Sequence, residues 1–493
     1  MMEEKYQKPS SFTSKDGQEH IETFSTTSKD APFVPSKAEQ KLVKKLNWSF
    51  MPFVCVLIFV QFLDKTILSI ISVLPDFFHD TGISKDQYGW LGSFFYLGFL
   101  CMQLPNNYLM QKFTISKYIG VILVIWGGSL LSMAWATNFS QLAALRFLLG
   151  FFEATSYPCM FLLIATMYRR AEQVVWFGVL FMSNSVAMIL GGLIGAGIMK
   201  LPTVGAISPW KWAFIIFGSI TTAMGFLYFI FLPDRPTSRW FRLTEDEKAI
   251  VEERSRDNAV IPTLKVNYDH IREALGEPRL YVYCLIALLI ELQNGALTIF
   301  QTLIISDLGY NSFDAMLLTI PSGVVSLILM YGSTQISKSK GEIIWVAIVT
   351  CGFSLVGLIL LLAIPTGGAK LLGLYFSWGC TPTYTLMQAS ISSNVSGYTK
   401  KIFYTSGSLI FYTIGNFIGP LLLRENDAPR YFMGMSVYVA ANVVTILLFL
   451  YLRFSYTQAN KKRHLDKNTN IVALPGDLED ITDAQNQNFV YRT

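Results

Sequence analysis

Residues 50–72 read FMPFVCVLIFVQFLDKTILSIIS, an apolar run that carries Asp64 and Lys65 side by side. A helix needs about 20 mainly apolar residues to cross the hydrocarbon core of a membrane, so this run is long enough for one span. An ionisable side chain at the bilayer centre costs roughly 2.5 to 3.5 kcal/mol on insertion scales, and it is rarely kept there without a use. The stretch therefore predicts a membrane-spanning helix whose charges belong to a polar pathway for an ion or a solute.

The composition of the whole chain indicates the same class. Of its 493 residues, 52% are hydrophobic and only 15% are charged, against about 25% charged in soluble globular proteins. The net charge of +5 is too small and too scattered to predict a nucleic-acid partner. The six cysteines fall within hydrophobic stretches without a CxxC pair, so we expect them to pack as small apolar residues, with no disulfide or metal role.

Further apolar segments of similar length bring the predicted spans to twelve. Their approximate centres are Val60, Cys101, Ile125, Ala154, Val186, Ile220, Leu292, Val325, Phe353, Cys380, Tyr412 and Val443. The longest polar stretch between spans, residues 233–278, divides them six and six. We therefore predict an all-α membrane protein with twelve transmembrane helices in two six-helix bundles.

The same division sets the domain boundaries. The expected parts are a disordered cytoplasmic N-tail (1–45), an N-terminal bundle (46–232), a cytoplasmic linker (233–278), a C-terminal bundle (279–454) and a cytoplasmic C-tail (455–493). Within the linker, the stretch TEDEKAIVEERSRD predicts a short charged helix with Thr244 as its N-cap and Glu247 completing a capping box. No short apolar core with a cleavage site opens the chain, so the first span is expected to act as the targeting signal.

Lysine and arginine are distributed unevenly between the loops on the two sides. If the N-terminus is cytoplasmic, most of them lie on the cytoplasmic side, including those of the linker. An excess of Lys and Arg is typical of cytoplasmic loops. Both termini are therefore expected in the cytoplasm. The plasma membrane is the expected location, and the endoplasmic reticulum and the vacuole are alternatives.

Two spans of the first half carry paired charges. On the first, Gln61 lies one turn before Asp64 and Lys65, so three polar side chains share one sector of the helix. On the fourth, Arg146 and Glu153 are seven residues apart, nearly on one face and about 10 Å apart along the axis. Two acids and two bases on two helices can neutralise one another, which lowers the cost of burying them.

These charges support two interpretations. A buried Lys65 or Arg146 can bind an anionic group such as a carboxylate, and a desolvated Asp64 or Glu153 can take up and release a proton. Together they predict proton-driven uptake of an organic anion, with Asp64 and Glu153 in proton coupling and Lys65, Arg146 and Gln61 in substrate binding. The alternative is that the charges are ion pairs that fix the register of the helices.

Two spans of the second half add candidate substrate ligands. In the seventh, Glu291 has Asn294 about one turn away on a similar face, and a structural role is equally open. The tenth contains GCTPTYTLMQ, in which Pro382 is expected to break the helix. A broken helix is tolerated where its backbone lines a cavity. Tyr384 and Gln388, one turn apart after the proline, are the remaining candidates.

Several classes of protein find no support in the sequence. No histidine lies in the middle of a span, so a histidine proton relay is not expected. The chain has no Walker motif, no GxGxxG nucleotide motif and no cluster with metal-ligand spacing, which argues against an ATP-driven pump and a redox enzyme. We expect no enzyme activity and no cofactor, with the proton gradient as the driving force.

Longer motifs resemble one family. The stretch RFLLGFFEATSYP from Arg146, continuing through MYRRAEQVVWFG to GGLIGAGI, is similar to the fourth and fifth spans of the major facilitator superfamily, and within it to the fungal allantoate permease family of anion:cation symporters. WKWAFIIFG from Trp210 and LPDRPTSRWFRLTEDEK from Leu232 fit the same family. In the second half, SGYTKK from Ser396 and GNFIGP from Gly415 resemble the allantoate permease subgroup.

The resemblance implies two six-helix bundles around a central site that opens alternately to either side. It implies a small carboxylate substrate, such as allantoate, ureidosuccinate, nicotinate or pantothenate, moved with protons. It also implies proton coupling at Asp64 and Glu153 and anion binding at Lys65 and Arg146. Two departures stand out: Lys65 lies where many relatives have arginine, and PNNYLMQKF, residues 105–113, lacks the acid usual in that loop.

The expected partners are a small organic anion, protons and the lipid bilayer, and we expect a monomer. Two other functions stay open. One is a non-transporting nutrient sensor on the same fold, and the other is a transporter of a cationic vitamin such as thiamine, for which the acids would be the ligands. A carrier without proton coupling is a further alternative, and the buried acids argue against it.

Overall fold

The computed structural model describes residues 36–203, 205, 207–258, 267–364, 367–467, 481–486 and 489–492. Most of the expected N-tail, residues 1–35, lies outside this part. Nine helices of the described chain, two of them with a break, are long and apolar enough to cross a membrane. The three other predicted spans are also helices, but they are shorter or more polar. The all-α fold is confirmed.

The helices follow the predicted six-plus-six order. The first half contains α1 (Lys37–Ile71), α2 (Phe77–Thr81), α3 (Lys85–Lys112), α4 (Ile115–Ser132), η1 (Met133–Trp135), α5 (Phe139–Glu153), α6 (Ser156–Met167), α7 (Arg170–Met199) and α8 (Pro209–Phe231). The linker contains η2 (Arg239–Phe241), α9 (Glu245–Asn258) and α10 (Tyr268–Gly276). The second half contains α11 (Pro278–Asp307), α12 (Ser312–Leu317), α13 (Ile320–Lys340), α14 (Ile343–Ala363), α15 (Ala369–Ser377), α16 (Cys380–Asn394), α17 (Tyr398–Ile418), η3 (Gly419–Leu422), η4 (Glu425–Asp427) and α18 (Phe432–Lys467).

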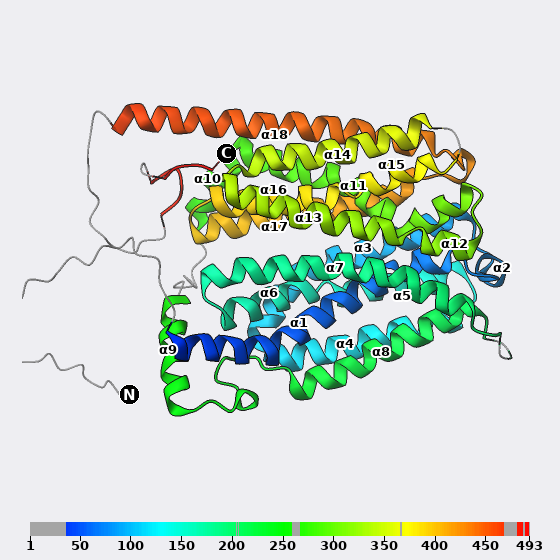
Figure 1. The fold of residues 1–493 in the computed structure, drawn as a ribbon, viewed down its shortest axis with the longest axis horizontal. Coiled ribbons are helices and arrows are strands. Elements are labelled where there is room, and N and C mark those ends of the chain that lie inside the picture. The colour runs from blue at the N-terminus through cyan, green and yellow to red at the C-terminus, as the bar shows by residue number, and fades with distance from the viewer. Residues whose placement is uncertain are drawn as a thin grey trace, which may run out of the picture.

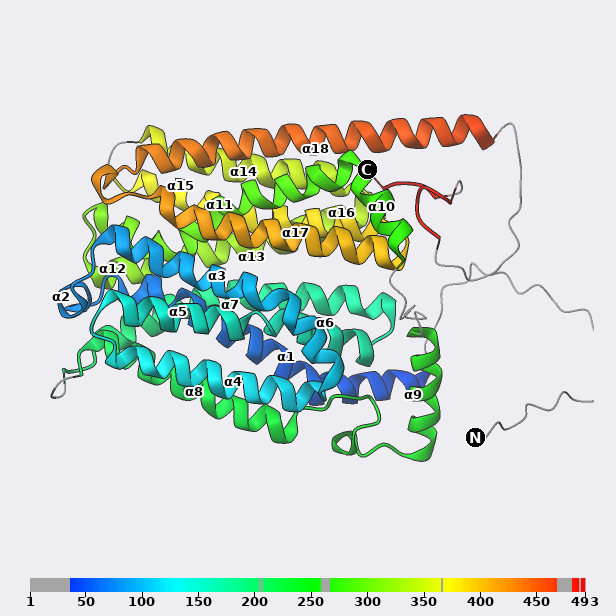
Figure 2. The ribbon, with the colours of Figure 1, turned by 180° about the vertical axis from the view of Figure 1, so that it is seen from behind.

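The two halves lie side by side, with α1 to α8 in one and α11 to α18 in the other (Figures 1 and 2). Helices α9 and α10 lie at one end of the molecule, which we call the linker end. Helices α2 and α12 lie at the opposite end, which we call the far end. The long spans run between these two ends, so a path between the halves would connect the two sides of a membrane.

Contacts between the halves gather toward the far end. The hydroxyls of Ser69 and Thr302 lie 2.8 Å apart, buried between α1 and α11. Lys85, the first residue of α3, forms a salt bridge of 3.0 Å with Asp307, the last residue of α11. These bonds hold the far ends of the two halves together.

Two spans are interrupted beside candidate site residues. The fourth breaks after Glu153, between α5 and α6. The tenth breaks at residues 378–379, one turn before Pro382. Proline lacks the N–H that would bond the carbonyl one turn earlier. The predicted break therefore has the predicted cause, but it lies at Trp378 and Gly379 and leaves Pro382 inside α16.

The linker helix begins as predicted. The Thr244 N–H donates to Glu247 at 3.0 Å, and the Glu247 N–H donates to the Thr244 hydroxyl at 3.3 Å, which completes the capping box. Lys45 on α1 then donates to Glu247 at 2.9 Å. Helix α9 is therefore attached to the first half of the molecule.

Candidate functional site

The first and fourth spans are joined by a buried hydrogen bond between two predicted site residues. The Gln61 amide on α1 donates to Oε1 of Glu153 on α5 at 2.8 Å. Both side chains are buried, and the second carboxylate oxygen of Glu153 has no hydrogen-bond partner. The interruption after Glu153 leaves this carboxylate at the end of α5. The arrangement suits a group that changes its charge, because one oxygen is held and the other is open to a proton.

Asp64 faces a different neighbour. Its Oδ2 accepts a hydrogen bond of 2.7 Å from the Thr221 hydroxyl on α8, and its buried Oδ1 has no partner. Consecutive residues on a helix point about 100° apart. Asp64 therefore points toward Thr221 of α8, while the next side chain, Lys65, points in another direction. The polar side chains of the first span, expected to share one sector, face different helices.

Arg146 is 2% exposed, and its buried Nη2 has no hydrogen-bond partner. It interacts electrostatically with Glu153 and Asp64. Among the described residues, however, neither Arg146 nor Lys65 forms a salt bridge. The four charges thus balance one another at longer range, and both cations keep hydrogen-bonding capacity for a ligand.

Lys65 lies against two aromatic rings of α3. Its Nζ is 5.5 Å from the Phe95 ring centroid and 5.3 Å from that of Tyr96, within the range of cation–π attraction. The side chain is half-buried. Its ammonium interacts electrostatically with Glu153 of the first half and Glu291 of the second. Lys65 is therefore a cation placed between acids of both halves.

Glu291 on α11 is held by two amides. Its Oε2 accepts hydrogen bonds of 2.8 Å from Asn294, on the same helix, and of 2.8 Å from Asn416 on α17. The Asn294 amide also donates to Asn416 at 3.1 Å. The predicted neighbours Glu291 and Asn294 are thus brought together. Asn416, which was not predicted as a site residue, completes the group.

The remaining candidates lie on α16. The Gln388 amide donates to the Tyr384 hydroxyl at 2.8 Å and to Ser408 at 3.2 Å. The Tyr384 ring lies 5.0 Å from that of Tyr412 on α17. Tyr384 and Tyr412 both lie within electrostatic range of Glu291, so this pair belongs to the same central region.

Two further tyrosines of the first half belong to this region and were not predicted as site residues. Tyr96 and Tyr157 each lie within electrostatic range of both Glu153 and Glu291. Tyr157 lies one turn after Glu153, and its hydroxyl accepts from Asn184 on α7 at 2.8 Å. The four-residue spacing from Glu153 was a usable signal, but nothing local to the sequence distinguishes these tyrosines from packing aromatics.

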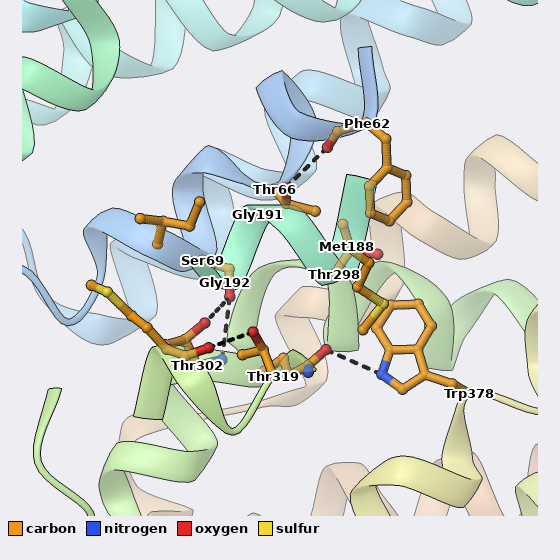
Figure 3. A pocket seen from close by; sticks show the side chains of 13 residues that line it. Phe62, Thr66, Ser69, Met188, Gly191, Gly192, Thr298, Thr302, Thr319 and Trp378 are labelled. Carbon is orange, nitrogen blue, oxygen red and sulfur yellow. Dashed lines mark hydrogen bonds between the residues drawn. The ribbon is translucent and has the colours of Figure 1, made fainter. Parts of the chain in front are cut away.

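A cavity of about 420 Å³, counting space that opens to solvent, lies between the halves (Figure 3). Its lining comes from both halves and contains no charged side chain: Phe62, Thr66, Ser69, Ile70, Met188, Gly191, Gly192, Thr298, Gln301, Thr302, Met316, Thr319 and Trp378. None of the predicted site residues is part of it. The cavity adjoins the charged region along α1, because Thr66 follows Lys65 directly.

The hydrogen-bonding groups of the cavity are largely engaged with each other. The Trp378 indole N–H donates to Gln301 at 3.1 Å, and the Gln301 amide donates to Ser322 at 2.8 Å. Figure 3 shows Trp378 on one side of the cavity and Ser69 with Thr302 on another. The site thus has a charged part around Lys65 and an uncharged part toward the far end.

Comparison with known proteins gives a consistent result. The sequence model of the Major Facilitator Superfamily matches residues 54–422. The chain is 31% identical to an allantoate permease of Saccharomyces cerevisiae, over 93% of this chain and 87% of that protein. It is 27% identical to a thiamine pathway transporter of the same yeast, over 92% of this chain and 86% of that protein. The crystal structure of a D-xylose–proton symporter has a similar fold, with a TM-score of 0.63, 12% identity, and coverage of 82% of this chain and 97% of that one.

Proposed function

The chain belongs to the major facilitator superfamily and, within it, to the fungal allantoate permease family, and from that membership we propose a proton-coupled symporter for a small organic anion. The substrate is a carboxylate nutrient or vitamin, imported across the plasma membrane by alternating access. Both termini and the linker end face the cytoplasm. The family makes the chain a membrane transporter, and the proposal adds the substrate charge, the coupling ion and the direction.

The observation that carries the proposal is the state of Lys65. Its ammonium is half-buried between the halves and, among the described residues, has no carboxylate in salt-bridge contact. Two aromatic rings contact it, which restrict its motion without using its hydrogen-bonding capacity. A substrate carboxylate that enters the central region would give the Lys65 ammonium the anionic partner that it lacks among the described residues. Arg146, which is buried and incompletely hydrogen-bonded, contributes a second buried positive charge, which interacts electrostatically with Glu153 and Asp64.

Asp64 and Glu153 are the proposed proton carriers. Each is fully buried and has one carboxylate oxygen without a hydrogen-bond partner. An ionised carboxylate buried without full pairing is costly, and binding a proton removes that cost. The electrostatic interaction of Glu153 with Lys65 provides the coupling, because an anion bound at Lys65 would favour protonation of Glu153.

The arrangement of the halves fits one stage of alternating access. The halves are bonded to each other toward the far end through Ser69 and Thr302 and through Lys85 and Asp307. With the linker end in the cytoplasm, this stage corresponds to an inward-facing carrier. The substrate would leave toward the cytoplasm from this state.

The test is uptake by the purified full-length chain in liposomes with an inward proton gradient. The probes are labelled allantoate, ureidosuccinate, nicotinate, pantothenate and thiamine, each tested singly. We expect accumulation of one or more carboxylates that collapses when a protonophore dissipates the gradient. Carboxylate uptake that does not depend on the proton gradient would overturn the proposed proton coupling. Absence of all uptake by a folded preparation would favour the non-transporting nutrient sensor.

Uptake of a cationic vitamin such as thiamine is the second candidate. It is favoured by the surplus of acids in the central region, where Asp64, Glu153 and Glu291 outnumber Lys65 and Arg146. The similarity to a thiamine pathway transporter points the same way. Thiamine uptake without carboxylate uptake in the liposome experiment would show that the substrate is a cation. The acids would then be its ligands.

A further inference from the structure

The described residues of the C-terminal tail, 481–486 and 489–492, lie against the linker end of the second half (Figure 1). We call these residues the strap. They come after α18 and return to contact α10, α16, α17 and α18 through the bonds described below. The transport site proposed above does not use any of them.

One anchor of the strap is a buried charge cluster. The Nζ of Lys400, on α17, lies 2.7 Å from Glu273, 2.6 Å from Glu277 and 2.8 Å from Asp483 of the strap. The Lys400 side chain is 0% exposed and that of Asp483 is 3% exposed. The next strap residue toward α18, Thr482, donates to Glu273 at 3.0 Å. The strap therefore fastens α10 to α17.

The second anchor holds the strap by its backbone. The Tyr491 N–H donates to the Asn460 side chain at 2.9 Å, and the Asn460 amide donates back to the Tyr491 carbonyl at 2.9 Å. Arg492 makes the same pair with Asn394, at 2.7 and 2.9 Å. Two asparagines, one on α18 and one on α16, thus each bond the backbone N–H and the carbonyl of one strap residue.

The Tyr491 side chain fixes the register of this second anchor. Its ring lies 4.8 Å from the Arg279 guanidinium, 4.5 Å from that of Arg463 and 4.9 Å from the Tyr456 ring. Its hydroxyl donates to Asp483 at 2.8 Å, which connects the two anchors. Burial, paired backbone groups and stacked cations together describe a built binding site for this segment.

The first half carries a comparable cluster at the corner between α6 and α7. Arg254 of α9 lies 2.6 Å from Glu39 and 2.5 Å from Glu172, and Arg169 lies 3.2 Å from Glu39. The linker helix thus covers this corner. In the second half, α10 and the strap cover the corner between α16 and α17, where Ser396 donates to the strap backbone at 3.0 Å.

The covered corner lies at the end that must move. A carrier cannot be open at both ends at once, so opening the far end requires the linker ends of the two halves to approach each other. In the present state the linker ends of α16 and α17 are bonded to the strap and to α10. The strap therefore restrains the linker ends of α16 and α17, which take part in this approach.

We propose that the strap is an autoinhibitory contact, which stabilises the state closed at the far end and slows the change to the state open there. Release of the strap then raises the population that is open at the far end. The proposal depends on alternating access alone and is independent of the substrate or the coupling ion.

The test measures far-end opening in the full-length chain. Spin labels carried by non-natural amino acids replace His79 and Asn426, which are exposed at the far ends of the two halves, and pulsed electron resonance gives their distance distribution. We expect Tyr491→Ala to raise the long-distance population about fivefold or more. Val490→Ala is the matched control, because this neighbouring side chain is 56% exposed.

One further measurement and two further variants make the result decisive. Hydrogen exchange at the amides of Tyr491 and Arg492 reports whether the strap has left its site. Asp483→Asn weakens the first anchor, and a chain ending at residue 480 removes the strap outright. A rise in the long-distance population whenever exchange shows release supports the proposal. An unchanged or smaller population after release, in protein with an unaltered melting temperature, overturns it.

Discussion

Gln61 on α1 and Glu153 at the end of α5 are joined by a buried hydrogen bond of 2.8 Å. The bond holds one carboxylate oxygen and leaves the other without a partner. Neutralising Glu153 keeps its shape and removes its charge change. We expect Glu153→Gln to abolish gradient-driven accumulation of the transported carboxylate while exchange of labelled for unlabelled substrate continues. The measurement compares the two assays in liposomes.

The matched control for this experiment is Glu245→Gln, because the Glu245 side chain on α9 is 88% exposed. It should leave both assays unchanged. Accumulation that survives in Glu153→Gln would remove Glu153 from proton coupling and leave Asp64 as the remaining candidate of the pair.

Lys65 should be required for its charge. We expect Lys65→Met to weaken carboxylate binding by about tenfold to a hundredfold, the equivalent of one lost charge-assisted hydrogen bond. Lys65→Arg should restore much of it. Lys112→Met is the control, because Lys112 also lies over a ring, 4.4 Å from the Tyr108 centroid, but outside the central region. Equal binding constants for the Lys65→Met protein and the unmodified chain would contradict the assignment.

Asn416 should act through Glu291. Asn416→Ala removes one of the two amides on Oε2 of Glu291, and a lost hydrogen bond to a charged group costs about 1.5 to 3 kcal/mol. We expect a lower melting temperature for this variant. In a Glu291→Gln background the same substitution should cost less, so the two effects should be non-additive in a double-mutant cycle. Additive effects would show that the pair is not coupled.

Gly192 should be needed for closure at the far end. A Cβ atom there would lie 2.6 Å from Oγ1 of Thr319 and 2.7 Å from the Met316 carbonyl, both in the second half. Gly192→Ala should therefore push the halves apart and populate the state open at the far end, as seen by the spin-label distances. Gly197→Ala on the same helix is the control, because nothing lies within 4 Å of its added Cβ. An unchanged distance distribution would mean that the neighbours move aside.

Arg254 should hold α9 on the first half. Its side chain is 4% exposed and pairs with Glu39 and Glu172, and removing one partner of a buried pair costs about 3 to 5 kcal/mol. We expect Arg254→Met to raise hydrogen exchange along α9 by about a hundredfold. Lys248→Met, which breaks only an exposed pair with Glu245 on the same helix, should have little effect. Similar exchange in both variants would show that α9 is held by other contacts.

Much of the fold is a local property of the sequence. The spans follow from the lengths of the apolar runs, because each must cross the hydrocarbon core. The start of α9 follows from the capping box at Thr244, whose two bonds lie within four residues. Even the break of the tenth span follows from the missing N–H of Pro382, although it appears one turn earlier than expected.

The partners of each charge were decided by the tertiary structure. The sequence placed Asp64, Lys65, Arg146, Glu153 and Glu291 inside spans, but it gave no rotation of one helix against another. Packing turned Asp64 toward Thr221, 157 residues away, and Glu291 toward Asn416, 125 residues away. Hydropathy indicates which side chains lie within the membrane. The direction in which each side chain points depends on contacts between helices that are distant in sequence. The closed far end and the bound strap depend on such contacts as well.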